Sequence, residues 1–385
     1  MTRSNRKSVA DLVRENVVNT ASNKVLYNWD NPAGASFGEA AFQATHNVHE
    51  GGQFTDEMLA KLLDAYPREQ LGIYKFPDHS DGVVKADHGR APKLTGAQIL
   101  NAVKQGQIWL NLRAVNRHLP AFAELSDELF SQLEQAFGII TLKQDVGVLI
   151  SSPNIHVHYH LDIPLVTLVQ LRGEKTLYLY PAEPPFRSAA AIEKIARRTQ
   201  DEELHFDHSF ENSVQAVTLS PGMAITWPQT APHRVQNSDS LNVSLSCEFM
   251  TMPAILRANA IYANSLLRDK LGVDPAYPEA VGALTMAKAG LARLSKKLSP
   301  LREKGPTPIT FELLANGDVS YFPHRRVTDF PLALADKPTT EAGLHRSCCM
   351  KMPMTCPNKR SLIGAICSRV AGILIRRFCR LNLQS

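Results

Sequence analysis

The sequence predicts a mainly β protein in which a jelly-roll barrel lies between an N-terminal α/β layer and C-terminal helices. Between residues 145 and 250 there are about eight short apolar or alternating runs, and turn residues separate several of them. Before residue 140, helical and strand periodicities are mixed, and after Phe249 the period becomes helical again. These changes of period divide the chain into three ordered parts and a tail.

Residues 1–140 form the predicted α/β layer. A helix is expected from Phe54 to Tyr66, because its apolar period follows a Thr55 cap and acidic residues in the first turn. Thr95 and Gln98 fit a capping box at the start of a second helix. Residues 107–113 alternate like a strand, and a third helix is expected from a Ser126 cap to Gly138.

Residues 141–250 form the predicted barrel, in which strand-like runs such as VGVLIS, LVTLVQL and LNVSLSCEF recur at regular spacing. A charged segment of helical character, residues 184–213, interrupts them and is expected to be an insert at the rim.

Residues 251–328 are expected to form C-terminal helices and a hairpin. Two helices carry apolar residues on one side: Ile255, Ala258, Tyr262 and Leu266 on the first, and Val281, Leu284, Leu291 and Leu294 on the second. These helices would either make a homodimer contact or simply cover the barrel. Asn316-Gly317 predicts a tight hairpin turn.

Charge is distributed unevenly along the chain. The net charge is +5, but residues 342–385 hold eight Lys or Arg and no acid, which leaves 34 basic and 37 acidic residues elsewhere. A mildly acidic body without a basic groove argues against a nucleic-acid partner. Neither a secretion signal nor an apolar run long enough for a membrane span is present, so the expected location is cytoplasmic.

The tail, residues 329–385, is basic and contains five of the six cysteines. It is expected to be disordered or peripheral. Two other readings are an amphipathic helix on an anionic membrane surface and an altered reading frame at the end of the gene.

Histidines follow one another at alternate positions in the run IHVHYHLD. In a strand, successive side chains point to opposite faces, so His156, His158, His160 and Asp162 would share one face. Four such groups are costly to bury unless they bind something. A metal ion is the ligand that imidazole and carboxylate groups favour.

A second histidine motif follows about seventy residues later. Gly222, Pro228, His233 and Asn237 have the spacing of the pattern Gly-x5-Pro-x-Gly-x2-His-x3-Asn, with Thr230 in place of the second glycine. Barrel closure would bring His233 next to the first histidine strand. Two imidazoles and one carboxylate on one side of a metal leave positions open for oxygen and a co-substrate.

These motifs resemble the JmjC and cupin-like iron(II)/2-oxoglutarate oxygenases over residues 145–250. In that family a Gln, a Gly and a Lys follow the first ligand histidine at fixed distances, and Gln170, Gly173 and Lys175 lie at those distances from His160. The resemblance implies a double-stranded β-helix, the cupin/JmjC jelly roll, as the core. It also implies a dioxygenase that hydroxylates a protein side chain or a small molecule.

The same resemblance implies a set of site residues. His160, Asp162 and His233 would bind iron(II), and Lys175 would pair with the distal carboxylate of 2-oxoglutarate. Asn242 and Ser244 would line the co-substrate pocket or orient the histidines.

Two departures from the family pattern leave alternatives open. The family often has a hydroxyl where this chain has Val157 and an amide where it has Val166. His156 and His158, together with Asp162 and His233, would give a different set of ligands, like the four-ligand site of ordinary cupins. The alternatives are therefore a metal cupin that does not use 2-oxoglutarate, such as a dioxygenase or isomerase, and a non-catalytic cupin that binds sugar or has a regulatory role.

Overall fold

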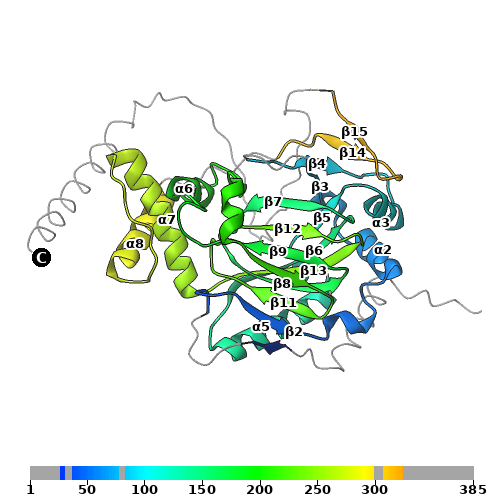
Figure 1. Cartoon of the computed structure of the whole chain (residues 1–385), viewed down its shortest axis with the longest axis horizontal. Coiled ribbons are helices and arrows are strands. Elements are labelled where there is room, and N and C mark those ends of the chain that lie inside the picture. Colours follow the sequence, from blue (N-terminus) through cyan, green and yellow to red (C-terminus); the bar gives the residue numbers. More distant parts are fainter. Residues whose placement is uncertain (1–26, 31–36, 78–82, 299–306, 324–385) are drawn as a thin grey trace, which may run out of the picture. The chain divides into compact units, whose positions relative to one another are not determined.

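Two β-sheets form the centre of the computed structural model, which describes residues 27–30, 37–77, 83–298 and 307–323 (Figure 1). The strands of the larger sheet are, in spatial order, β1 (Asn28–Trp29), β2 (Phe42–Thr45), β11 (Met223–Thr226), β8 (Leu165–Arg172), β13 (Asn242–Met250), β6 (Leu142–Ser151), β5 (Trp109–Leu112), β3 (Gly72–Lys75), β4 (Asp87–Arg90), β14 (Phe311–Leu313) and β15 (Val319–Tyr321). Those of the smaller sheet are β10 (Gln215–Leu219), β9 (Lys175–Leu179), β12 (His233–Asn237) and β7 (His156–His160).

Eight of these strands, β6 to β13, have the connectivity of a double-stranded β-helix. Along the chain they pass repeatedly from one sheet to the other, which gives the antiparallel orders β11-β8-β13-β6 and β10-β9-β12-β7. The predicted mainly β jelly-roll fold is therefore confirmed. The N-terminal part adds β1 to β5 to the larger sheet, so it contributes strands as well as helices.

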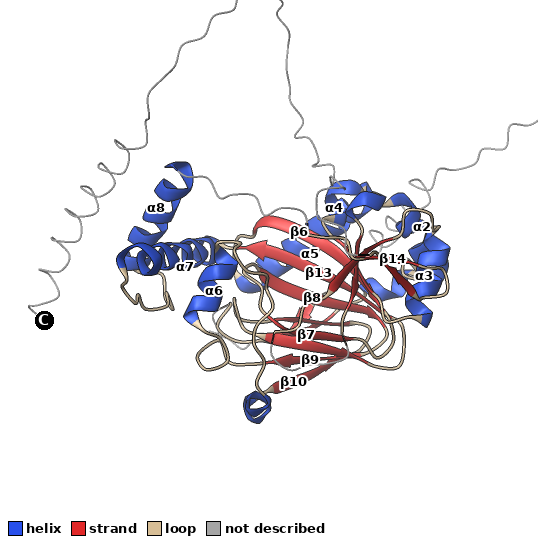
Figure 2. Ribbon diagram, turned by 90° about the horizontal axis from the view of Figure 1, so that it is seen from above, coloured by secondary structure: helices blue, strands red, loops and turns tan. Residues whose placement is uncertain are grey.

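Helices of the N-terminal part cover the outer face of the larger sheet (Figure 2). They are α2 (Asp56–Ala65), α3 (Gly96–Gln105), α4 (Val115–His118) and α5 (Pro120–Phe137), with the 3₁₀ turns η1 (Val48–Gly51) and η2 (Arg68–Gln70). The cap at Thr55 and the capping box of Thr95 with Gln98 are both present, as predicted. A continuous apolar core lies between these helices and the sheet.

The predicted start of the third helix was wrong. Helix α5 begins at Pro120 instead of Ser126, because proline suits the first helical position and Phe122 and Leu125 already bury apolar side chains in the first turns. Ser126 lies inside the helix and is 2% exposed. The helix ends at Gly138 as predicted, with a left-handed φ of 63°.

The space between the two sheets holds a second apolar core, which includes Leu168, Leu177, Val217 and Trp227. On the outer face of the smaller sheet a third core packs Tyr159 and Tyr180 under the segment that joins β9 and β10. This segment contains α6 (Ala189–Ala196) and η3 (His208–Ser213) and corresponds to the predicted insert. The interior of the barrel is thus largely apolar, and both outer faces are covered.

The C-terminal part consists of α7 (Met252–Leu271), α8 (Ala283–Leu298) and the hairpin of β14 and β15. Gly272 ends α7, and the hairpin forms around Asn316-Gly317; both were predicted. None of the described helices is long and apolar enough to cross a membrane. The predicted tail, residues 329–385, lies outside the described residues.

The leucines that mark the apolar side of α8 do not pack against α7. Leu284, Leu291 and Leu294 are 55%, 41% and 53% exposed, whereas the small Ala292 is buried in the contact with α7. Small side chains let the two helix backbones approach closely, so the leucines turn outward. A homodimer through these helices stays a prediction.

Candidate active site

Three predicted ligand residues lie together at one end of the barrel. His160 is the last residue of β7, His233 is the first of β12, and the two are direct partners in the antiparallel ladder. Asp162 follows β7 by two residues, and its Oδ2 lies 3.4 Å from Nε2 of His233. One ligand atom from each of the three residues lies within 4.8 Å of the others. Pairing of the two strands thus brings together residues that are 73 positions apart.

Backbone carbonyls fix the tautomer of both histidines. Nδ1 of His160 lies 2.7 Å from the carbonyl oxygen of His158, and Nδ1 of His233 lies 3.1 Å from that of Ala231. A carbonyl can only accept a hydrogen bond, so each Nδ1 carries a proton, and Nε2 is the nitrogen that a neutral imidazole would offer to a metal. This is the arrangement that a histidine ligand needs.

Burial also sets the charge of these groups. It lowers the pKa of His233 well below its usual value, with a further contribution from His160, so His233 is neutral at pH 7. Burial raises the pKa of Asp162, although His160 and Arg113 oppose this. A neutral imidazole is ready to bind a metal, and a divalent cation would add positive charge beside this partly buried carboxylate.

A β-bulge separates His160 from the other two histidines of the run. His160 pairs with His233, but Val157 pairs with Val235, so β7 has one more residue than β12 in this interval. The extra residue breaks the alternation: Val157 packs in the core between the sheets, whereas His158 contacts Phe76. The expectation that all three histidines share one face was therefore wrong.

The two alternative ligands lie away from the group of three. Nε2 of His158 lies 3.2 Å from the carbonyl oxygen of Pro77, and its ring centroid is 4.8 Å from that of His156. Among the described residues, only His160, Asp162 and His233 form a group of three potential ligands. Of the two possible sets of ligands, strand pairing brings together the one that contains His160.

Lys175 lies deeper in the barrel. It begins β9, where it is the ladder partner of Asn237, while His233 pairs with Leu179 four residues further along. At about 3.3 Å per residue, the two backbone positions are about 13 Å apart. Lys175 is 4% exposed, burial lowers its pKa to about 7, and its ammonium has no hydrogen-bond or ion-pair partner among the described residues.

Asn242 and Ser244 are fully buried, and both side chains already make hydrogen bonds within the protein. Ser244 donates to Oε1 of Gln170 at 2.6 Å, and Nε2 of Gln170 donates to Oδ1 of Asn242 at 2.8 Å. Gln170 also donates to the carbonyl oxygen of Gly173, and Asn242 to that of Glu174. These contacts hold the Gly173 turn that leads into Lys175. The two residues thus support the lysine through the turn, and their predicted contact with a co-substrate stays a prediction.

Two further carboxyl groups lie near Asp162: Glu248, on the same strand as the predicted Asn242 and Ser244, and Glu202, which the sequence did not indicate. Burial raises the pKa of Glu248 to about 7, and the Asp162 carboxylate adds to the shift. The pKa of Glu202 is raised to about 7 by the same two causes, although the residue as a whole is solvent-exposed. Glu202 reaches this place because residues of the insert pair with the edge of β7: the amide of Leu161 donates to the carbonyl of Glu202 at 3.2 Å.

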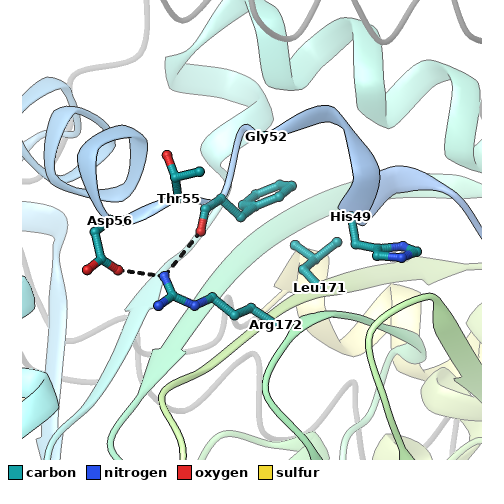
Figure 3. Close-up of a pocket in the computed structure, with 7 residues that line it drawn as sticks. His49, Gly52, Thr55, Asp56, Leu171 and Arg172 are labelled. Atoms are coloured by element: carbon teal, nitrogen blue, oxygen red, sulfur yellow. Dashed lines mark hydrogen bonds and ion pairs between the residues drawn. The ribbon is translucent and has the colours of Figure 1, made fainter.

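A separate pocket of about 350 Å³ is lined by His49, Gly52, Phe54, Thr55, Asp56, Leu171 and Arg172 (Figure 3). Arg172 donates to the carbonyl of Phe54 at 3.5 Å and to Asp56 at 2.6 Å. Arg172 ends β8, whereas His160, Asp162 and His233 lie near the beginning of that strand, so this pocket is at the opposite end of the barrel. Its charged groups already pair with one another, and none of the three predicted ligands lines it.

Comparisons with known proteins add a likeness of fold. No family model and no curated protein matches the chain. An X-ray structure of Escherichia coli YcfD is similar, with 18% identity, a TM-score of 0.40, and coverage of 71% of this chain and 70% of that one.

Two further structures of Escherichia coli YcfD, each described as a ribosomal oxygenase, are also similar. The one in complex with cobalt and 2-oxoglutarate has 19% identity and a TM-score of 0.35, and the one with cobalt and succinic acid has 18% and 0.34. Both matches cover 64% of this chain, which spans 59% and 60% of those chains. The function of this chain is therefore argued from its own residues.

Proposed function

We propose that this protein is an iron(II)- and 2-oxoglutarate-dependent dioxygenase that hydroxylates a protein side chain or a small molecule. One observation carries the proposal: the group of His160, Asp162 and His233 and the unpaired ammonium of Lys175 lie at two depths of the same barrel. The first is a site for a metal, and the second is a site for an anion.

The three ligand residues fit iron(II). The Nδ1 atom of each histidine donates to a carbonyl, which leaves Nε2 as the atom available to a metal, and Asp162 has an oxygen beside them. Two imidazoles and one carboxylate suit non-haem iron and leave coordination positions open. When bound, iron(II) supplies the positions at which oxygen and the co-substrate react.

Lys175 fits the distal carboxylate of 2-oxoglutarate. A buried ammonium without a partner is unstable in an apolar surrounding, and a carboxylate would give it a charge-assisted hydrogen bond. Along the strands, the backbone of the lysine is about 13 Å from that of His233. A short dicarboxylate reaching from the metal ligands to Lys175 would satisfy both ends.

The remaining residues would position and shield the reactants. The apolar side chains between the sheets, including Leu177 and Trp227, exclude water from the space around the co-substrate. The Trp227 ring centroid lies 4.8 Å from that of His233 and limits the movement of this imidazole.

Succinate release tests the proposal. Purified protein with iron(II), ascorbate and 2-oxoglutarate should release succinate in air and none without oxygen, with cell extract added in a second series as a source of substrate. His233→Ala should abolish release. His156→Ala is the matched control, because this histidine is on the same strand but outside the ligand group, and it should retain release.

Two other outcomes would favour the alternatives. Stoichiometric metal binding that His160→Ala abolishes, with no succinate under any condition, would indicate a metal cupin that does not use 2-oxoglutarate. Absence of metal binding would indicate a non-catalytic cupin.

We separately propose that the protein dimerises through α7 and α8. Sedimentation of wild type and of Leu291→Ser tests this proposal, since Leu291 is exposed on α8.

A further inference from the structure

The turn that leads into His233 contains a residue in an unfavourable backbone conformation. Thr230 has a φ of 61°, in the left-handed region, where a β-branched residue is an outlier and glycine fits best. Three residues later the chain presents the His233 ligand. The turn therefore needs contacts that hold Thr230 in this conformation.

Arg187 of the insert makes these contacts. Its Nη1 donates to Oγ1 of Thr230, to the carbonyl oxygen of the same residue at 3.4 Å, and to the hydroxyl of Tyr277 at 2.9 Å. Thr230 and Tyr277 are also in contact, with 2.8 Å between their hydroxyl oxygens, and Thr230 donates to the carbonyl of Gln229 at 2.6 Å. All of these contacts are consistent if the Tyr277 hydroxyl donates to Thr230.

The burial of Arg187 is unusual for a cation with neutral partners. The residue is 5% exposed, and no carboxylate forms an ion pair with it among the described residues. Its guanidinium carbon lies 4.1 Å from the centroid of the Tyr277 ring, which gives a cation–π contact. A buried arginine that serves only packing would be costly, so its hydrogen bonds to the turn are the reason for its position.

The same turn also holds the segment after the carboxylate ligand. Gln229 donates to the carbonyl of Ile163, the residue after Asp162, at 2.8 Å. Its Oε1 accepts from Arg257 of α7 at 2.9 Å. A shift of this turn would therefore move His233 directly and Asp162 through Ile163.

Helix α7 anchors the insert that carries Arg187. Arg268 of α7 donates to both carboxylate oxygens of Glu193 in α6, at 2.9 and 3.2 Å, and Glu193 is 3% exposed. Tyr277 lies in the segment between α7 and α8. The C-terminal helices thus fix the insert and one wall of the Arg187 contact.

We infer that Arg187 is a positioning residue that, with Thr230 and Tyr277, holds the His233 turn in the geometry for metal binding. This inference rests on the proposed function, because it assigns a role toward the metal. It explains why the chain tolerates Thr230 where the motif has glycine: the threonine hydroxyl provides the contact, and Arg187 keeps the backbone in the strained conformation.

Cobalt(II) titration of the metal-free protein, followed by visible absorption, tests the inference in a double-mutant cycle. Arg187→Met should weaken cobalt binding about tenfold, as the loss of a residue that orients a ligand typically does. Thr230→Gly should bind nearly as well as wild type, because glycine adopts this φ without help. In the Thr230→Gly background, Arg187→Met should then have little further effect.

Arg197→Met is the matched control, since this arginine of the same segment contacts Ser265 and Asp269 of α7. It should lower the thermal midpoint without changing the cobalt affinity. If Arg187→Met leaves the affinity unchanged, or weakens it equally in both backgrounds, Arg187 has only a structural role and the inference is wrong.

A second measurement does not require metal. The Nδ1 proton of His233, which the Ala231 carbonyl holds, should give a protected signal in nitrogen-edited spectra of wild type and lose protection in Arg187→Met. Wild-type protein that binds no cobalt would refute the proposed function, and this spectrum would still decide whether Arg187 positions the ring. An unchanged signal in the variant would overturn the inference.

Discussion

Replacing Lys175 by methionine should stabilise the protein and at the same time remove co-substrate binding. Burial lowers the pKa of this lysine from 10.5 to about 7, and its ammonium has no partner among the described residues. Since the unfolded chain binds the proton more tightly than the folded protein does, the stability of wild type should rise with pH between about 7 and 10.5. Methionine has a similar shape and no proton to lose.

The magnitude follows from the shift in pKa. A difference of about 3.5 units corresponds to a penalty of about 4 kcal/mol at pH 7, which falls to about 1 kcal/mol at pH 9.5. The gain in unfolding free energy of Lys175→Met over wild type should therefore be several times larger at pH 7 than at pH 9.5.

Urea unfolding of the metal-free protein at the two pH values measures this difference. Lys61→Met is the control, because Lys61 pairs with Glu57 near the surface of α2, and its effect should be the same at both pH values. In the presence of cobalt(II), 2-oxoglutarate should raise the thermal midpoint of wild type and leave that of Lys175→Met unchanged. A gain in stability that does not depend on pH, or a loss of stability at pH 7, would refute the reasoning.

Three further predictions concern other buried positions. Burial raises the pKa of Glu248 to about 7, so the folded protein favours the protonated form and loses stability as pH rises from about 4.5 to 7. In urea unfolding, metal-free Glu248→Gln should therefore be more stable than wild type at pH 8. The difference should vanish near pH 4. Burial raises the pKa of Cys247 to about 12, so this thiol should resist iodoacetamide at pH 8 in the native state and react after unfolding, as mass spectrometry would show. Gly222→Ala should lower the unfolding free energy by about 1–3 kcal/mol, because φ is 92° and the new Cβ would lie 2.8 Å from Cε1 of His49; calorimetry showing no loss would contradict this.

Local chemistry made much of the fold predictable. The caps at Thr55 and Thr95, the glycine ends of two helices and the Asn316-Gly317 hairpin depend on a few neighbouring residues, and all are present. The barrel was predictable because its strands repeat a short period, and the spacing of the two histidine motifs narrowed the ligands to a few candidates. The start of α5 was missed because a buried serine resembled a cap, and burial is not a local property.

The sequence by itself determined the barrel, because its strands repeat a short period. The resemblance of its motifs to an oxygenase family indicated the residues of the candidate site, including Lys175 at a fixed distance from His160. The tertiary structure decided which histidines meet. The bulge in β7 turns His160 toward His233 and His158 toward Phe76, and a bulge exists only when two strands are paired. Arg187 reached Thr230 in the same way: the two are 43 residues apart in the chain, and only packing of the insert against the barrel brings them into contact.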